Sequence, residues 1–168
     1  MNIYQYALKL EKDSENYYNK LISKTDDIGL QTILKMLVDE EAKHFSIVEQ
    51  MMKTDTCPEL VKTDILKNAK NIFEKIKGKK LEFNFDLTQA DFYRKAQEFE
   101  EKSHQHYLEI SDKVEDKTQK NLLLKLAEEE KKHMFLLENL VEFTSRPENG
   151  LRMQNLIIWL SIKAWITK

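Results

Sequence analysis

The chain has 168 residues, of which 33% are charged, and its formal net charge is -2. A chain of this length forms one domain with a sizeable core, and 3 Gly with 2 Pro cannot supply the turns of an all-β fold. The near-neutral charge argues against a nucleic-acid binder, and the single cysteine, Cys57, excludes an internal disulfide and a Cys-rich metal site within one chain.

The amino terminus has a helical pattern and no apolar run of signal-peptide length. We therefore expect a cytoplasmic protein. The longest apolar stretch, residues 156–166, is interrupted by Lys163 and is too short to span a bilayer, so no membrane contact is expected.

Helical periodicity predicts a first pair of helices over residues 2–23 and 28–53. The turn between them, residues 24–27, carries side chains that suit helix capping. A second pair of helices is predicted over residues 89–113 and 117–145. The short loop within each pair indicates that its two helices are antiparallel neighbours.

A long connection joins the two pairs. It begins with Cys57-Pro58 and carries an amphipathic helix that stops near Gly78, after which residues 80–86 look extended or irregular. The apolar positions of this helix are Leu60, Ile65, Ala69, Ile72, Phe73 and Ile76. Short loops within each half and a long crossover between the halves predict an all-α, ferritin-like four-helix bundle built from two helical hairpins.

The two halves repeat one pattern. Without a gap, ALKLEKDSENYY from Ala7 aligns with AQEFEEKSHQHY from Ala96, and LVDEEAKHFSIVE from Leu37 aligns with LAEEEKKHMFLLE from Leu126. Both alignments use one offset of 89 positions. The identical pairs include Glu11/Glu100, Ser14/Ser103, Tyr18/Tyr107, Asp27/Asp116, Glu40/Glu129, Glu41/Glu130, Lys43/Lys132 and His44/His133. The sequence therefore reads as a duplicated helical hairpin.

Each of the four helices places a glutamate in its apolar stripe. In the second and fourth helices a Glu-x-x-His pair interrupts the stripe between Leu or Val residues, and in the first and third a glutamate follows an Ala and precedes a Ser and a Tyr. Because Glu and His at positions i and i+3 share a helix face, one helix can supply both ligands to one ion. The side chains that this pattern selects are Glu11, Glu41, His44, Glu100, Glu130 and His133.

Four carboxylates in a bundle core repel one another and lose their hydration, which costs several kcal/mol per ion without compensation. Two divalent cations cancel four such charges, and carboxylate with imidazole is a ligand set that iron and manganese accept. A single Glu-x-x-His in a Lys/Glu-rich helix is usually a solvated face, but two copies in register favour the two-metal carboxylate pattern. We expect two iron ions, with manganese or zinc as alternatives.

Other polar residues near the six ligands are expected to have simpler roles. Glu40, Glu128 and Glu129 are expected to point away from the site as surface charges. His104 could approach the site and His106 points away from it, and a surface role is expected of both. Two tyrosines, Tyr18 and Tyr107, lie two turns after their glutamates, where they either hydrogen-bond ligand carboxylates from a second layer or serve as core aromatics.

The segments EKDSENYY, LVDEEAKH, EFEEKSHQHY and LAEEEKKH resemble the rubrerythrin branch of the ferritin-like superfamily over roughly residues 3–149. The resemblance implies a ferritin-like domain over residues 1–149 with a di-iron site that reduces hydrogen peroxide or oxygen. It implies that one iron is served mainly by Glu11, Glu41 and His44 and the other by Glu100, Glu130 and His133. Of the four catalytic glutamates, Glu41 and Glu130 are the expected bridges.

The chain departs from the family in two ways. It lacks the paired Cys-x-x-Cys motifs of a rubredoxin domain, so the resemblance implies that a separate redox protein supplies electrons. Ser103 stands where classical members carry an extra glutamate, for which His104 is a possible substitute. By analogy we expect a homodimer, in which the crossover of residues 54–87 either stays within one chain or swaps between two.

Two other functions stay open at this point. The site could take up iron or another divalent metal for binding or storage without turnover, or the bundle could be structural, with a site that is empty or holds zinc.

Residues 150–168 form an atypical apolar tail that contains Trp159 and Trp165 and no acid. In the family that the chain resembles, this position commonly carries a peptide like WVENAEF. A DNA sequence that encodes WVENAEF can be chosen so that translation starting one base later gives GLRMQNL, which are residues 150–156 of this chain. The tail is therefore either an out-of-frame terminus or a real segment that docks on the bundle or on a neighbouring chain. It is assigned no catalytic role.

Overall fold

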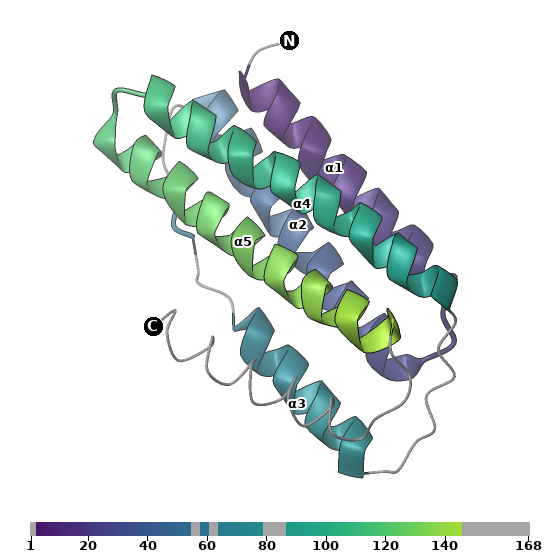
Figure 1. The fold of residues 1–168 in the computed structure, drawn as a ribbon. Coiled ribbons are helices and arrows are strands. Elements are labelled where there is room, and N and C mark those ends of the chain that lie inside the picture. Colours follow the sequence, from purple (N-terminus) through teal and green to yellow (C-terminus); the bar gives the residue numbers. More distant parts are fainter. Residues whose placement is uncertain (1–2, 55–57, 61–63, 79–86, 146–168) are drawn as a thin grey trace.

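The computed structural model describes residues 3–54, 58–60, 64–78 and 87–145. These residues form five helices: α1 (Ile3–Ile22), α2 (Ile28–Thr54), α3 (Ile65–Gly78), α4 (Leu87–Lys113) and α5 (Lys117–Ser145). Helices α1, α2, α4 and α5 run along a common axis as a four-helix bundle, and the described residues contain no strand (Figure 1). The predicted all-α fold is confirmed.

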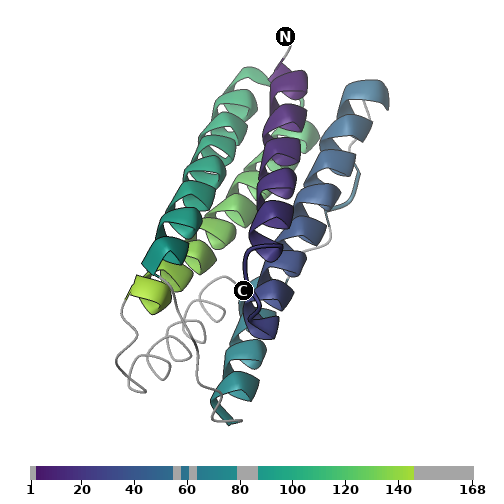
Figure 2. The ribbon, with the colours of Figure 1, turned by 90° about the vertical axis from the view of Figure 1, so that its right-hand side faces the viewer.

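Each half is an antiparallel hairpin, and the two hairpins meet through α1 and α4. Figure 2 shows α1 between α4 and α2, with α5 behind them. The hairpin turns are capped alike, because the Asp27 carboxylate accepts the Leu30 N–H and the Asp116 carboxylate accepts the Gln119 N–H, both at 2.8 Å. The repeat-equivalent aspartates thus begin α2 and α5.

The crossover helix α3 packs against α2 and α5 at the end of the bundle where α2 begins and α5 ends (Figure 1). Three of the predicted apolar residues, Ile65, Ala69 and Phe73, are buried there together with Leu66, and the predicted Ile72 is partly buried. Leu60, which we predicted as part of this helix, lies before α3 and is buried at the opposite end of the bundle.

Two apolar clusters fill the core, one toward each end of the bundle. Repeat-equivalent residues fall in opposite clusters: Leu37 lies in the first and Leu126 in the second, whereas Ala96 lies in the first and Ala7 in the second. A duplicated hairpin produces this exchange when its copies are related by a twofold axis across the bundle. Near that axis, between the clusters, lies a belt of buried polar side chains.

Several predictions fall outside the described residues: the side chain of Ile76, the irregular segment 80–86, Cys57 and the tail 150–168. Among the described residues, none of the helices has the length and apolar composition that a membrane span requires.

Candidate metal centre

The belt between the apolar clusters contains all six predicted ligands. Four of the six side chains, Glu41, His44, Glu130 and His133, come from α2 and α5, and α1 and α4 contribute Glu11 and Glu100. Each of the six is at most 1% exposed. They are brought together because each helix turns its apolar stripe inward and the ligand lies within that stripe.

Each histidine pairs with the glutamate of the opposite half. His44 Nδ1 lies 2.7 Å from Glu130 Oε1, and His133 Nδ1 lies 3.0 Å from Glu41 Oε1. The two imidazole rings stack with centroids 5.5 Å apart and planes 15° apart. The glutamates of α1 and α4 complete the arrangement, with His44 Nδ1 3.6 Å from Glu11 Oε2 and His133 Nδ1 3.3 Å from Glu100 Oε2.

The geometry forms two overlapping ligand groups. In each group the four ligand atoms lie within 4.8 Å of one another. The first group is Glu11, Glu41, His44 and Glu130, and the second is Glu41, Glu100, Glu130 and His133. Glu41 and Glu130 belong to both, which is the arrangement expected of carboxylates that bridge two ions.

The polar atoms of this centre fit metal ions better than they fit one another. Among the described residues, eleven buried side-chain N and O atoms have no hydrogen-bond partner, and eight of them belong to Glu11, Glu41, His44, Glu130 and His133. Buried polar groups without partners are rare and costly. Carboxylate oxygens and imidazole nitrogens that converge in this way match the donors that divalent iron, manganese or zinc accept.

The charges of the centre are strongly perturbed without metal. Burial, together with the charges of Glu100, Glu130 and Glu11, raises the pKa of Glu41 well above its usual range. Burial and the Glu130 charge raise the pKa of Glu100 to about 8. Burial alone would raise the pKa of Glu130, but the charge of His44 and the close approach of both imidazoles outweigh it, and that pKa is lowered.

The pKa of each histidine is raised, although burial alone would lower it. Burial favours the neutral imidazole, yet the Glu130 charge and close contacts with carboxylates raise the pKa of His44, and close contacts with Glu100, Glu130 and Glu41 raise that of His133. The metal-free centre thus holds protons where divalent ions would supply positive charge.

The two tyrosines connect the halves. The Tyr18 hydroxyl donates to Glu100 Oε1, and the Tyr107 hydroxyl donates to Glu11 Oε1. Burial and the nearby carboxylates raise the pKa of both tyrosines, so they remain protonated donors. Of the two roles considered for Tyr18 and Tyr107, the structure supports the contact with carboxylates from a second layer.

Two predicted surface charges are in fact buried. Glu40 is 7% and Glu129 3% exposed, and they pair with Lys43 at 2.9 Å and Lys132 at 2.8 Å. The prediction was wrong because the folded bundle covers this repeat-equivalent position on both α2 and α5, and helical spacing alone does not identify which neighbours cover a face. Glu128 is exposed as predicted.

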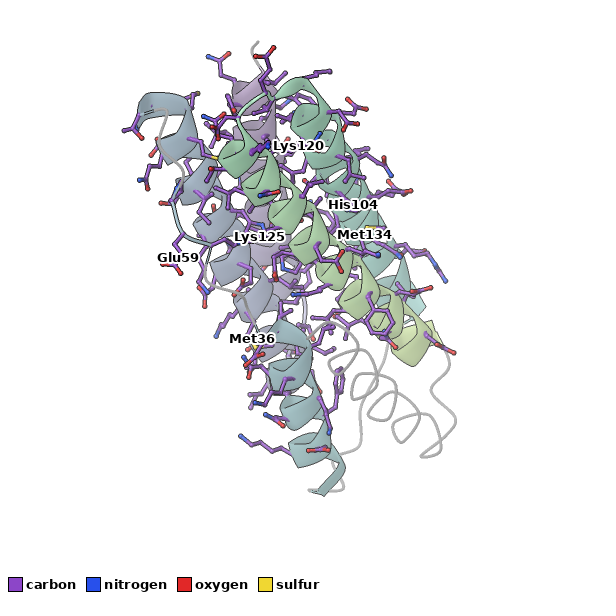
Figure 3. The ribbon with its side chains drawn as sticks, turned by 90° about the vertical axis from the view of Figure 1, so that its left-hand side faces the viewer. Met36, Glu59, His104, Lys120, Lys125 and Met134 are labelled. Carbon is purple, nitrogen blue, oxygen red and sulfur yellow. The ribbon has the colours of Figure 1, made fainter. Side chains whose placement is uncertain are left out.

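Neither remaining histidine belongs to the ligand groups. His104, labelled on α4 in Figure 3, contacts α5, where its Nδ1 lies 2.7 Å from the Ala127 carbonyl oxygen. It therefore does not substitute for the acid that Ser103 replaces. His106 Nε2 lies 3.0 Å from the Ile3 carbonyl oxygen, and its ring packs edge-on against Tyr6. Both histidines are half-buried between helices, not free on the surface as predicted.

Sequence reasoning did not single out the serines as site residues. Ser14 and Ser103 are each 1% exposed, and neither hydroxyl has a hydrogen-bond partner. The sequence signal that could have identified them is that the same residue, serine, occurs at both repeat-equivalent positions.

The comparisons with known proteins agree with this geometry. A family model described as Rubrerythrin matches residues 2–141. No curated protein and no solved structure matches the chain.

Proposed function

The chain belongs to the rubrerythrin family, and on that premise we propose that it is a non-haem di-iron oxidoreductase that reduces hydrogen peroxide or oxygen. The observation that carries this proposal is the pair of overlapping ligand groups joined by Glu41 and Glu130. Two ions that share two carboxylates act together, and the reduction of peroxide is a two-electron reaction.

The six ligands would divide between two irons. Glu11 with His44 would hold one ion and Glu100 with His133 the other, and Glu41 and Glu130, which belong to both groups, would serve both ions. Tyr18 and Tyr107 would fix the outer glutamates in position, each from the opposite half.

Two ferrous ions held by these residues would supply two electrons. Reduction of one hydrogen peroxide consumes these two electrons and two protons and releases two waters. The chain contributes a buried, mostly apolar surrounding, which keeps bulk water from the centre. It also places both histidines and all four glutamates on rigid helices, so that little reorganisation accompanies the change in charge.

Electrons for a second turnover would come from another molecule. A rubredoxin-type iron site needs four cysteine sulfurs, and the 168 residues hold one cysteine. We propose a separate redox protein as the donor and a homodimer as the working form, in which the crossover is a candidate for exchange between chains.

Anaerobic loading with ferrous iron followed by peroxide or oxygen tests the proposal. We expect rapid oxidation by peroxide, followed by re-reduction and a second round when a reductant is added. Glu128→Gln, at an exposed neighbour of the ligands, should behave as wild type. A centre that holds zinc and shows no redox response would contradict the proposal.

Binding of a divalent metal without turnover is the second candidate function. Ser103, in place of the acid that classical members carry, favours it. Stoichiometric ferrous loading with slow oxidation that cannot be cycled would select this alternative.

A further inference from the structure

Two buried serines lie beside the centre without hydrogen-bond partners. Ser14 on α1 and Ser103 on α4 are repeat-equivalent and each is 1% exposed. Among the buried polar atoms of the described residues that lack a partner, their Oγ atoms are the two hydroxyls. A buried hydroxyl left without a partner lowers stability, so its occurrence at both repeat-equivalent positions requires an explanation.

The helix register places both hydroxyls on the faces that enter the centre. Ser14 comes three residues after Glu11 and four before Tyr18, and residues with this spacing share one helix face. Glu11 Oε2 lies 3.6 Å from His44, and the Tyr18 hydroxyl donates to Glu100. Ser14 therefore lies between two side chains that reach the ligands.

The same spacing holds in the second half. Ser103 comes three residues after Glu100 and four before Tyr107, whose hydroxyl donates to Glu11. The two serines consequently belong to the α1 and α4 side of the metal centre, opposite the helices that supply its histidines.

A third buried serine shows the usual behaviour of this side chain in a helix. Ser111, also on α4 and 1% exposed, donates its hydroxyl to the Leu108 carbonyl oxygen at 2.7 Å. Serine commonly satisfies itself in this way. Ser14 and Ser103 do not, so their hydroxyls are free to donate to another acceptor. The tyrosine hydroxyls on the same side already donate to carboxylates.

We propose that Ser14 and Ser103 form a binding subsite for a small anion or hydroperoxide that reaches the metal pair from the α1 and α4 side. This proposal rests on the metal site of the proposed function and adds the groups that recognise its substrate. The cations attract a small electron-rich molecule, and each serine hydroxyl donates one hydrogen bond to its oxygen or nitrogen atoms. The twofold relation of the serines suits a molecule with two similar ends.

Azide binding to the cobalt-loaded protein tests the subsite without turnover. The wild type, Ser14→Ala, Ser103→Ala, the double variant and the control Ser111→Ala are loaded with Co²⁺, and azide is titrated while the visible spectrum of the cobalt is followed. We expect two Co²⁺ per chain in each protein. Azide affinity should fall about tenfold in each single variant and about a hundredfold in the double variant, as expected for lost hydrogen bonds to an anion. Ser111→Ala should bind azide as wild type.

The melting temperature of the metal-free proteins separates this role from a structural one. Ser14→Ala and Ser103→Ala should leave the melting temperature unchanged or raise it, because each removes a hydroxyl that has no partner. Ser111→Ala should lower it. A melting temperature lowered by all three substitutions alike would assign Ser14 and Ser103 to structure and overturn the proposal.

The outcomes of the azide titration separate the two proposals. Wild-type protein that binds no Co²⁺ would overturn the metal site and the subsite with it. Two Co²⁺ per chain with azide affinity unchanged in the double variant would overturn the subsite alone. Loss of Co²⁺ in Ser14→Ala or Ser103→Ala would also overturn it, because the serines would then support the metal ligands instead of the added anion.

Discussion

The apolar clusters and the polar centre lie on the same helices, one turn apart, and differ in what holds them together. Leu37 and Glu41 on α2 are both 0% exposed. Leu37 packs within an apolar cluster, whereas neither oxygen of Glu41 has a hydrogen-bond partner. The clusters therefore stabilise the fold by themselves, while the centre lowers stability until ions neutralise it. Substitutions in the two regions should have opposite effects on the metal-free protein.

The largest expected effect is in the clusters. Leu37→Ala or Leu126→Ala should lower the free energy of unfolding by about 2–5 kcal/mol, because each leaves a cavity in a fully buried region. The loss should be similar in metal-free and metal-loaded protein, as urea denaturation can measure. A loss that appears in only one of the two forms would show that the clusters and the centre are not independent.

In the metal centre, a substitution should stabilise the metal-free protein instead of destabilising it. Glu41→Gln should raise the free energy of unfolding of the metal-free protein by about 1–3 kcal/mol, since it removes an acid whose ionised form is disfavoured by burial and by the charges of Glu100, Glu130 and Glu11. The same variant should no longer hold two metals, because Glu41 belongs to both ligand groups. Glu128→Gln, on the exposed side of α5, is the matched control and should change neither quantity. A strongly destabilised metal-free Glu41→Gln protein would contradict the comparison.

The tyrosines sharpen the comparison because they belong to the clusters by packing and to the centre by their hydroxyls. Tyr18→Phe and Tyr107→Phe keep the ring and remove the hydroxyl. Metal affinity should fall about 10- to 100-fold, as for other groups that orient metal ligands, while the packing contribution is retained. Calorimetric titration with Co²⁺ measures the metal affinity. Equal affinity in Tyr18→Phe and wild type would show that the tyrosine hydroxyls do not orient the metal ligands.

The pH dependence of stability should distinguish the two forms of the protein. The pKa of Glu100 is raised to about 8 in the metal-free fold, so the folded state binds more protons than the unfolded state above the ordinary value of 4.5. The stabilisation that this proton on Glu100 gives the folded state is fully present below pH 4.5, and it is lost as the pH rises toward 8. The raised pKa values of His44 and His133 act in the same direction above pH 6.5.

Between pH 6 and 8, Glu100 alone should therefore cost the metal-free protein about 1 kcal/mol of stability per pH unit, and the two histidines should add to this loss. Thermal melts in a chelating buffer measure how stability changes with pH, and Glu100→Gln should make the decrease smaller. Metal affinity should change in the opposite sense and strengthen as pH rises, because the ions displace these protons. Metal-free stability that rises with pH over this range would be inconsistent with the described centre.

The sequence predicted the parts of the site that depend on one helix at a time. Periodicity located the bundle helices within two residues of their observed ends, and the repeat selected all six ligands. The features that the sequence left open or missed depend on neighbouring helices. The Tyr18–Glu100 contact needs the packing of α1 against α4, and the burial of Glu40 and Glu129 depends on neighbours in the folded bundle. Helical spacing fixes which residues share a face but not which neighbour covers that face.

Counting the ions in anaerobically iron-loaded protein tests the central claim most directly. Wild type and Glu128→Gln should each bind two ferrous ions per chain by elemental analysis, and Glu41→Ala and Glu130→Ala should bind fewer than two, since each removes a ligand common to both groups. Wild-type protein with no bound iron, or either alanine variant with two ions bound at wild-type affinity, would contradict a centre bridged by these two glutamates.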